Sequence, residues 1–320
     1  MSEHSIQITL IGAGTIGLSL AALHLSLSLD LILEKRLNLM ICDTRPDAFE
    51  YVLQTLPKYL PPDLNVDGEE RESFVRSLMM TDIIIITSDL RAAVLAADVI
   101  QEQGPENLSF KISLWPEVER HCPPKALLWT STSGILASTQ SLNMKNPSRL
   151  VVVHPYNPPH IMPLLEVVPS GVTSTDVIHR TMHFWESRGR TPVLLKETTG
   201  FVANRLAFAL FREAIHLVNE GVTSVEDVDK IVQSSMGPRW AVSGPFKSYH
   251  AGGGEGGLEA FFKNIGGTVQ ACWDSNGKVN VGEPWEKEVF RQTKQAYGVV
   301  DTTNRDEKTR RVLEAAGSSV

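Results

Sequence analysis

The chain has 320 residues and a formal net charge of -7, a length that suits two domains better than one. With 42% hydrophobic and 21% charged residues, its composition is that of an ordinary globular protein. No long basic block is present, so nucleic acid is not an expected partner. Three cysteines are scattered without metal or disulfide spacing, so we expect no metal site and a reducing, cytoplasmic location. We also expect no signal peptide and no membrane span.

Short apolar runs alternate with helical patterns through the first part of the chain. Continuous apolar runs are typical of strands that are covered on both faces of a sheet. The runs expected as strands lie at 6–11, 39–42, 82–87, 98–101, 126–130, 150–154 and 191–195. The alternation predicts an α/β fold, with a doubly wound, mostly parallel sheet in the N-terminal part.

The pattern changes after residue 196. A long helical pattern covers residues 201–219, and a second covers 225–236, where Ser224 has the position of an N-cap and Asp227 that of its capping-box partner. No further strand is expected. We therefore predict a nucleotide-binding domain over residues 1–196 and an all-α C-terminal domain over residues 197–320.

A glycine-rich loop follows the first expected strand. Its sequence is Gly12-Ala13-Gly14-Thr15-Ile16-Gly17, the Gly-x-Gly-x-x-Gly pattern of a strand turning into a helix. In such a loop, the first glycine makes the turn, the second leaves room for a pyrophosphate, and the third allows close packing of helix and strand. The helix N-terminus also favours negative charge. The motif predicts a Rossmann fold that binds a dinucleotide through these residues.

Asp43 ends the second expected strand, where such folds place the acid that binds the ribose hydroxyls. It comes late after Gly12, so the segment between Ser26 and Arg36 must be longer than usual. An acid at this place repels a 2′-phosphate, which favours NAD over NADP, although Arg45 weakens the preference. A turn or capping aspartate is the alternative.

His154 ends the apolar run 150–154, and Glu166 lies inside the next apolar run, 164–168. A carboxylate in an apolar strand is costly unless it is paired. Two antiparallel strands joined by the intervening proline-rich turn would place Glu166 against one ring nitrogen of His154. The other nitrogen would then face a substrate as a general base.

These features resemble the 3-hydroxyacyl-CoA dehydrogenase family, and within it the λ-crystallin and L-gulonate 3-dehydrogenase branch. The resemblance covers nearly the whole chain. It is carried by the glycine loop, 105–108 (Pro-Glu-Asn-Leu), 131–134 (Ser-Thr-Ser-Gly), the block 154–166, 200–205 (Gly-Phe-Val-Ala-Asn-Arg) and 237–241 (Gly-Pro-Arg-Trp-Ala). The Gln-Gly pair at 103–104 departs from the family pattern.

The resemblance implies roles for four further side chains, and the need of a free acid for a cation adds a fifth. Ser133 and Asn204 would hydrogen-bond the reacting oxygen, Glu106 would lie near the nicotinamide ribose, and Lys111 would lie on the cofactor or substrate side. Arg239 is a candidate clamp for a substrate carboxylate. The structural alternatives are a helix cap for Ser133, a bond within its helix for Asn204, a capping or surface acid for Glu106, a solvated lysine for Lys111, and an arginine that caps a helix C-terminus for Arg239.

The sequence thus predicts an NAD-dependent dehydrogenase that oxidises the 3-hydroxyl of a small polar acid such as L-gulonate to a ketone. Alternative functions are a 3-hydroxyacyl-CoA dehydrogenase, a carnitine-type dehydrogenase and a non-catalytic, crystallin-like structural protein. The family resemblance also implies a homodimer formed through the C-terminal domain.

Overall fold

The computed structural model describes residues 5–28, 32, 34, 36–61 and 71–317. The segment expected to be long, between Ser26 and Arg36, falls partly outside these residues. The chain divides into two compact units, one up to Ala203 and one from Asn204 onward. Each unit is described by itself.

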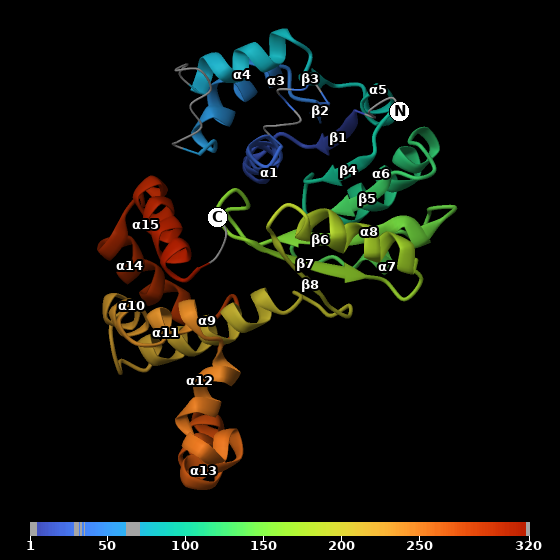
Figure 1. Ribbon diagram of the computed structural model, residues 1–320. Coiled ribbons are helices and arrows are strands. Elements are labelled where there is room, and N and C mark those ends of the chain that lie inside the picture. Colours follow the sequence, from blue (N-terminus) through green and yellow to red (C-terminus); the bar gives the residue numbers. More distant parts are fainter. Residues whose placement is uncertain (1–4, 29–31, 33, 35, 62–70, 318–320) are drawn as a thin grey trace. The chain divides into compact units, whose positions relative to one another are not determined.

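The first unit contains an eight-stranded sheet with the strand order β3-β2-β1-β4-β5-β6-β7-β8 (Figure 1). Strands β1 to β6 run parallel to one another, whereas β7 is antiparallel to β6 and parallel to β8. The strands are β1 (Ile6–Ile11), β2 (Leu37–Cys42), β3 (Ile84–Thr87), β4 (Val99–Glu102), β5 (Leu127–Thr130), β6 (Leu150–Pro155), β7 (Leu164–Pro169) and β8 (Thr191–Leu194).

Helices cover both faces of this sheet because its strands bury apolar side chains on both sides. Trp129 of β5 packs into one core cluster and its neighbour Leu128 into another. The first cluster contains side chains of α1 and α8, and the second contains side chains of α5 and α6. The helices of this unit are α1 (Thr15–Ser26), α3 (Ala48–Thr55), α4 (Arg71–Met80), α5 (Leu90–Val94), α6 (Leu108–His121), α7 (Ala137–Gln140) and α8 (Thr175–Glu186). The predicted doubly wound fold is confirmed.

The described residues of the second unit form helices joined by turns and loops, with no strand among them. Its helices are α9 (Ala203–Asn219), α10 (Val225–Ser234), α11 (Met236–Val242), α12 (Pro245–Gly252), α13 (Gly257–Ser275), α14 (Trp285–Tyr297) and α15 (Thr302–Ala315). Its buried apolar cluster is small and consists of Ile215, Val218, Trp285 and Val289. The unit therefore leaves much of its apolar surface exposed.

Two helix boundaries differ from the expected ones. The helix expected from residue 201 begins at Ala203, because Phe201 has a positive φ of 54° that an α-helix cannot contain. The helix expected over 225–236 ends at Ser234, and a second helix starts at Met236. The predicted Ser224 cap is confirmed, since its hydroxyl accepts the backbone N–H of Asp227.

Candidate functional site

Four neighbouring parallel strands end at one edge of the sheet. Strands β1, β4, β5 and β6 pair in that order and in the same direction. The glycine loop after β1, the turn after β5 and His154 near the end of β6 therefore share this edge. Ligands of open α/β sheets bind outside the carboxyl ends of the strands.

The glycine loop has the close contacts that its motif predicts. Gly12 has a φ of 105°, and a Cβ there would lie 2.9 Å from the carbonyl oxygen of Gln103. A Cβ on Gly17 would lie 1.9 Å from the carbonyl oxygen of Gly12. By contrast, a Cβ on Gly14 would meet nothing within 4 Å. Gly12 and Gly17 are thus closely packed against backbone atoms, whereas the space beside Gly14, just before α1, is open. A pyrophosphate could approach the backbone there.

Asp43 lies beside this loop, immediately after β2. Its Oδ2 accepts the backbone N–H of Ala13 at 2.7 Å, and its Oδ1 accepts that of Arg45 at 2.9 Å. The Arg45 side chain is engaged elsewhere, because its Nε lies 2.9 Å from Asp47 and its guanidinium lies 3.6 Å above the Tyr51 ring. The carboxylate is therefore fixed next to the loop, whereas the Arg45 side chain is held by Asp47 and Tyr51.

His154 and Glu166 face each other across strands β6 and β7. They are direct partners in the strand register, and His154 Nδ1 lies 2.8 Å from Glu166 Oε2. Both are buried, with 6% and 2% of their surfaces exposed. The second oxygen of Glu166 accepts the backbone N–H groups of Val202 and Ala203 at 2.9 and 2.8 Å. The carboxylate therefore has a partner on each oxygen.

These hydrogen bonds determine the charge of Glu166. Burial by itself would raise its pKa, but the hydrogen bonds from His154, Ala203 and Val202 outweigh burial, and the pKa lies below its usual value of 4.5. An ionised carboxylate can only accept, so Nδ1 of the histidine carries the proton. When the ring is neutral, its other nitrogen, Nε2, carries no proton.

Phe201 supports this pair from the turn before α9. It is fully buried, and its ring centroid lies 5.3 Å from that of His154. Its positive φ is unfavourable for a bulky side chain, at a cost on the order of 1–3 kcal/mol. The turn nevertheless keeps this conformation, which presents Val202 and Ala203 to Glu166. The sequence pattern did not reveal this support, because residue 201 was expected to be helical.

The loop between β6 and β7 is anchored at two points. His160 Nδ1 lies 2.8 Å from the hydroxyl of Ser19 in α1. Arg190 is buried and donates to the carbonyl oxygens of Pro159 and Met162. A buried arginine with carbonyl partners carries no sequence signature, so only the structure reveals this anchor.

Glu106 holds the turn that follows β5. Its Oε1 accepts the Thr132 hydroxyl at 2.5 Å and the backbone N–H groups of Ser133 and Gly134 at 3.0 and 3.1 Å. Glu106 is thus a half-exposed acid that caps backbone N–H groups of the turn, and its place near the nicotinamide ribose stays a prediction. The helix-cap alternative for Ser133 is wrong, because the nearest helix, α7, begins at Ala137 with Leu136 as its N-cap.

Lys111 is not the solvated lysine of the structural alternative, because only 1% of its surface is exposed. Its Nζ lies 2.6 and 2.8 Å from the two oxygens of Glu102, which is fully buried. Sequence reasoning missed Glu102. The available signal was its position directly after the apolar run expected over 98–101, as Asp43 directly follows the run expected over 39–42.

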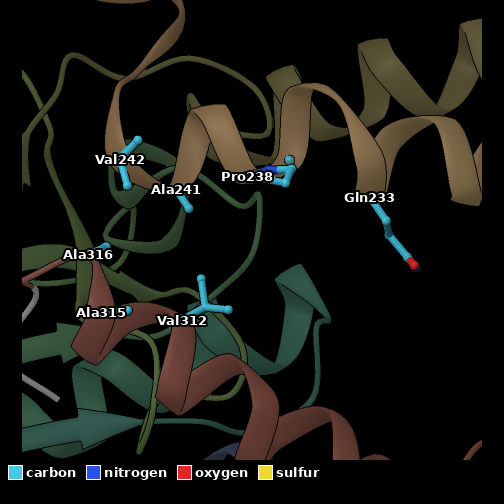
Figure 2. A pocket seen from close by; sticks show the side chains of 8 residues that line it. Gln233, Pro238, Ala241, Val242, Val312, Ala315 and Ala316 are labelled. Carbon is cyan, nitrogen blue, oxygen red and sulfur yellow. The ribbon is translucent and has the colours of Figure 1, made fainter.

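The remaining two predicted residues belong to the second unit. Asn204 is the second residue of α9, and Arg239 is exposed on α11. A cavity of about 420 Å³ lies between α11 and α15 (Figure 2). Arg239 is absent from its lining, which consists of Gln233, Gly237, Pro238, Ala241, Val242, Val312, Ala315 and Ala316. The roles predicted for Asn204 and Arg239 in substrate binding stay predictions.

Comparison with known families accounts for both units. Residues 7–198 match the NAD-binding domain of 3-hydroxyacyl-CoA dehydrogenase, and residues 200–287 match the C-terminal domain of the same enzyme. The chain belongs to the 3-hydroxyacyl-CoA dehydrogenase family. NAD is the cofactor of this family's N-terminal domain, in agreement with the glycine loop. Among the described residues, no helix is long and apolar enough to cross a membrane.

Relatives within the family carry two different names. An L-carnitine dehydrogenase from Oceanobacillus iheyensis is 37% identical over 60% of this chain and 63% of its own length. Another from a Pseudomonas species is 30% identical over 99% of this chain and 95% of its own. A 3-hydroxyacyl-CoA dehydrogenase from Gibberella moniliformis is 34% identical over 83% and 78%. The chain thus spans less than two thirds of the length of the Oceanobacillus relative. None of these relatives is named as a λ-crystallin or an L-gulonate 3-dehydrogenase, so that branch stays a prediction.

Solved structures share the fold along almost the whole chain. The NAD⁺-dependent dismutase 5-formyl-3-hydroxy-2-methylpyridine 4-carboxylic acid 5-dehydrogenase superposes with a TM-score of 0.76 at 25% identity, covering 98% of this chain and 99% of its own. A 3-hydroxyacyl-CoA dehydrogenase from Archaeoglobus fulgidus gives 0.64 at 22% identity, covering 98% and 100%, and supports the fold alone.

Proposed function

We propose that this chain is an NAD-dependent dehydrogenase that oxidises the 3-hydroxyl of a small, free, polar acid to a ketone. The observation that carries the proposal is the 2.8 Å contact between His154 and Glu166, at the sheet edge where the glycine loop lies. The protonated Nδ1 and the unprotonated Nε2 make His154 a general base.

The side chains divide the chemistry between them. Bound NAD supplies the hydride acceptor. His154 Nε2 takes the hydroxyl proton, and the resulting imidazolium is stabilised by Glu166. Ser133 and Asn204 hydrogen-bond the oxygen that becomes the ketone. Asp43 would accept hydrogen bonds from the ribose hydroxyls of NAD and would disfavour the 2′-phosphate of NADP.

Two free 3-hydroxy acids are the leading substrate candidates. L-Gulonate follows from the family branch that the motifs resemble. L-Carnitine is favoured by the names of several relatives, including one that matches nearly the whole chain. In both cases Arg239 would pair with the substrate carboxylate. The net charge of -7 disfavours a CoA ester, whose 3′-phospho-ADP group carries several negative charges.

A substrate panel tests the proposal. The purified chain is mixed with NAD and L-gulonate, L-carnitine, 3-hydroxybutyrate or a short 3-hydroxyacyl-CoA, and NADH formation is followed by absorbance. We expect one of the free acids to have the highest kcat/KM. A clear preference for the CoA ester would replace the proposed substrate class. NADH binding without turnover of any compound would favour the crystallin-like structural role.

We further propose that the chain forms a homodimer through its second unit. Helix α9 leaves Leu206, Phe208 and Phe211 about three-fifths exposed, at 61%, 63% and 59%. The buried cluster of this unit is too small to cover them. Exposed apolar side chains that gather on one element are typical of association surfaces.

A further inference from the structure

A buried ion pair lies beneath the turn that carries Ser133. Lys111 extends from the first turns of α6 and meets Glu102 at the end of β4, with both side chains at most 1% exposed. A buried ion pair is weak support for stability, because apolar residues of the same volume often replace it without loss. Its presence here therefore calls for an explanation other than folding.

Glu102 is held rigidly from three directions. Besides Lys111, it accepts the backbone N–H of Gly104 and the hydroxyl of Thr130, each at 2.7 Å. Gly104 makes this approach possible, because a Cβ there would lie 2.5 Å from the Phe110 ring and 3.0 Å from Glu102 Oε1. Gly104, which departs from the family pattern, is therefore one of the residues that bind the Glu102 carboxylate.

Lys111 also faces a second carboxylate. Its Nζ lies 3.9 Å from Oε2 of Glu106, whose side chain is 47% exposed. The other oxygen of Glu106, Oε1, holds the hydroxyl of Thr132 and the backbone N–H of Ser133. Glu106 therefore lies between a buried cation on one oxygen and the turn on the other.

The geometry points to Glu102 and Lys111 as positioning residues for the active site. Glu102 fixes the ammonium of Lys111, Lys111 holds the carboxylate of Glu106, and Glu106 fixes the turn that presents Ser133. The inference rests on the proposed function, in which the turn adjoins the reacting oxygen.

A mutant cycle through Glu106 tests this order. Glu102→Gln combined with Lys111→Met removes both buried charges together and leaves no unpaired one. We expect kcat/KM for the preferred acid to fall about tenfold or more in the native background. In a Glu106→Gln background the same pair of changes should lower kcat/KM less than about twofold, because residue 106 then no longer carries the charge that Lys111 holds.

Arg149→Met is the matched control. Arg149 is a buried cation that bonds the carbonyl oxygens of Pro123 and Ala126 at 2.7 and 3.1 Å, away from the turn. This variant should lower thermal stability and leave kcat/KM within about twofold of native. An unchanged kcat/KM in the doubly changed protein, or an equal loss in both backgrounds, would overturn the inference.

Two further measurements keep the test decisive. If circular dichroism shows that the doubly changed protein does not fold, Glu102→Gln alone, which keeps the side-chain volume, is put through the same cycle. If the native chain oxidises none of the tested acids, the proposed function fails, and the cycle is read from NADH affinity by fluorescence titration. The same non-additivity in NADH affinity would still support the positioning order, and simple additivity would refute it.

Discussion

Glu166 lies directly opposite His154 on the neighbouring antiparallel strand, and its Oε2 is 2.8 Å from Nδ1 of the imidazole. Because its other oxygen accepts the backbone N–H groups of Val202 and Ala203, the carboxylate is fixed in place. The histidine ring is therefore oriented by a group that cannot rotate freely.

Replacing the base should abolish turnover but not cofactor binding. His154→Ala removes the group that accepts the hydroxyl proton, so we expect kcat to fall on the order of 10²–10⁴-fold. NADH affinity, measured by fluorescence titration, should stay within a few fold of native because the glycine loop is untouched. Near-native turnover of any accepted acid would refute the mechanism.

Glu166→Gln should be nearly as damaging as the loss of His154. The new amide group can donate to Nδ1, which would move the ring proton to Nε2 and leave no basic nitrogen for the substrate. We expect a kcat loss on the order of 10²-fold or more. Steady-state kinetics across pH 6–9 check this. Rescue at high pH to the native rate would show that the tautomer is not the cause.

Acid should weaken the folded state through Glu166. The pKa of this carboxyl is lower in the folded chain than its ordinary value of 4.5. Its contribution to the free energy of unfolding is therefore complete above that value and is lost as the pH falls through the folded pKa. Urea unfolding at about pH 7 and pH 4 should show a smaller difference for Glu166→Gln than for the native chain. An equal difference would contradict the assignment.

Cofactor choice should depend on Asp43. Asp43→Asn removes the negative charge that repels a 2′-phosphate but keeps an oxygen for the N–H of Ala13. We expect the ratio of kcat/KM for NAD to that for NADP to fall about tenfold or more. Asp47→Asn is the control, since it frees Arg45 without changing the carboxylate beside the loop. An unchanged ratio for Asp43→Asn would assign this residue to the turn alone.

Association should depend on the exposed face of α9. Phe208→Glu places a charge in the proposed interface and should shift the chain from dimer to monomer in sedimentation velocity. Phe49→Glu, a change at another exposed phenylalanine, on α3, should leave the dimer intact. A native chain that sediments as a monomer at micromolar concentration would contradict the homodimer.

Features that depend on local pattern were predictable from the sequence. Strand β1 begins and ends where its apolar run does, and the contact between His154 and Glu166 follows from the cost of an unpaired buried carboxylate. The Ser224 cap is likewise a local signal. In each case, the residues that decide the outcome lie close together in the chain or on consecutive strands.

Features that depend on tertiary contacts were not predictable. Lys111 has the surroundings of a surface lysine in an amphipathic helix, and only the fold places Glu102 against it. The left-handed backbone of Phe201 is equally hidden, since nothing in a single sequence distinguishes it from the first residue of a helix. Both cases arise where packing overrides local preference.

The antiparallel register of β6 and β7 also limits how this candidate site can diversify. A slip of one residue would set Leu165 or Val167 opposite His154 and turn Glu166 toward the other face of the sheet. Insertions and deletions in the connecting loop can persist only when the loop absorbs them without shifting the strands. Descendants of this chain can therefore exchange the loop that follows the histidine more freely than they can change the alignment of the two strands.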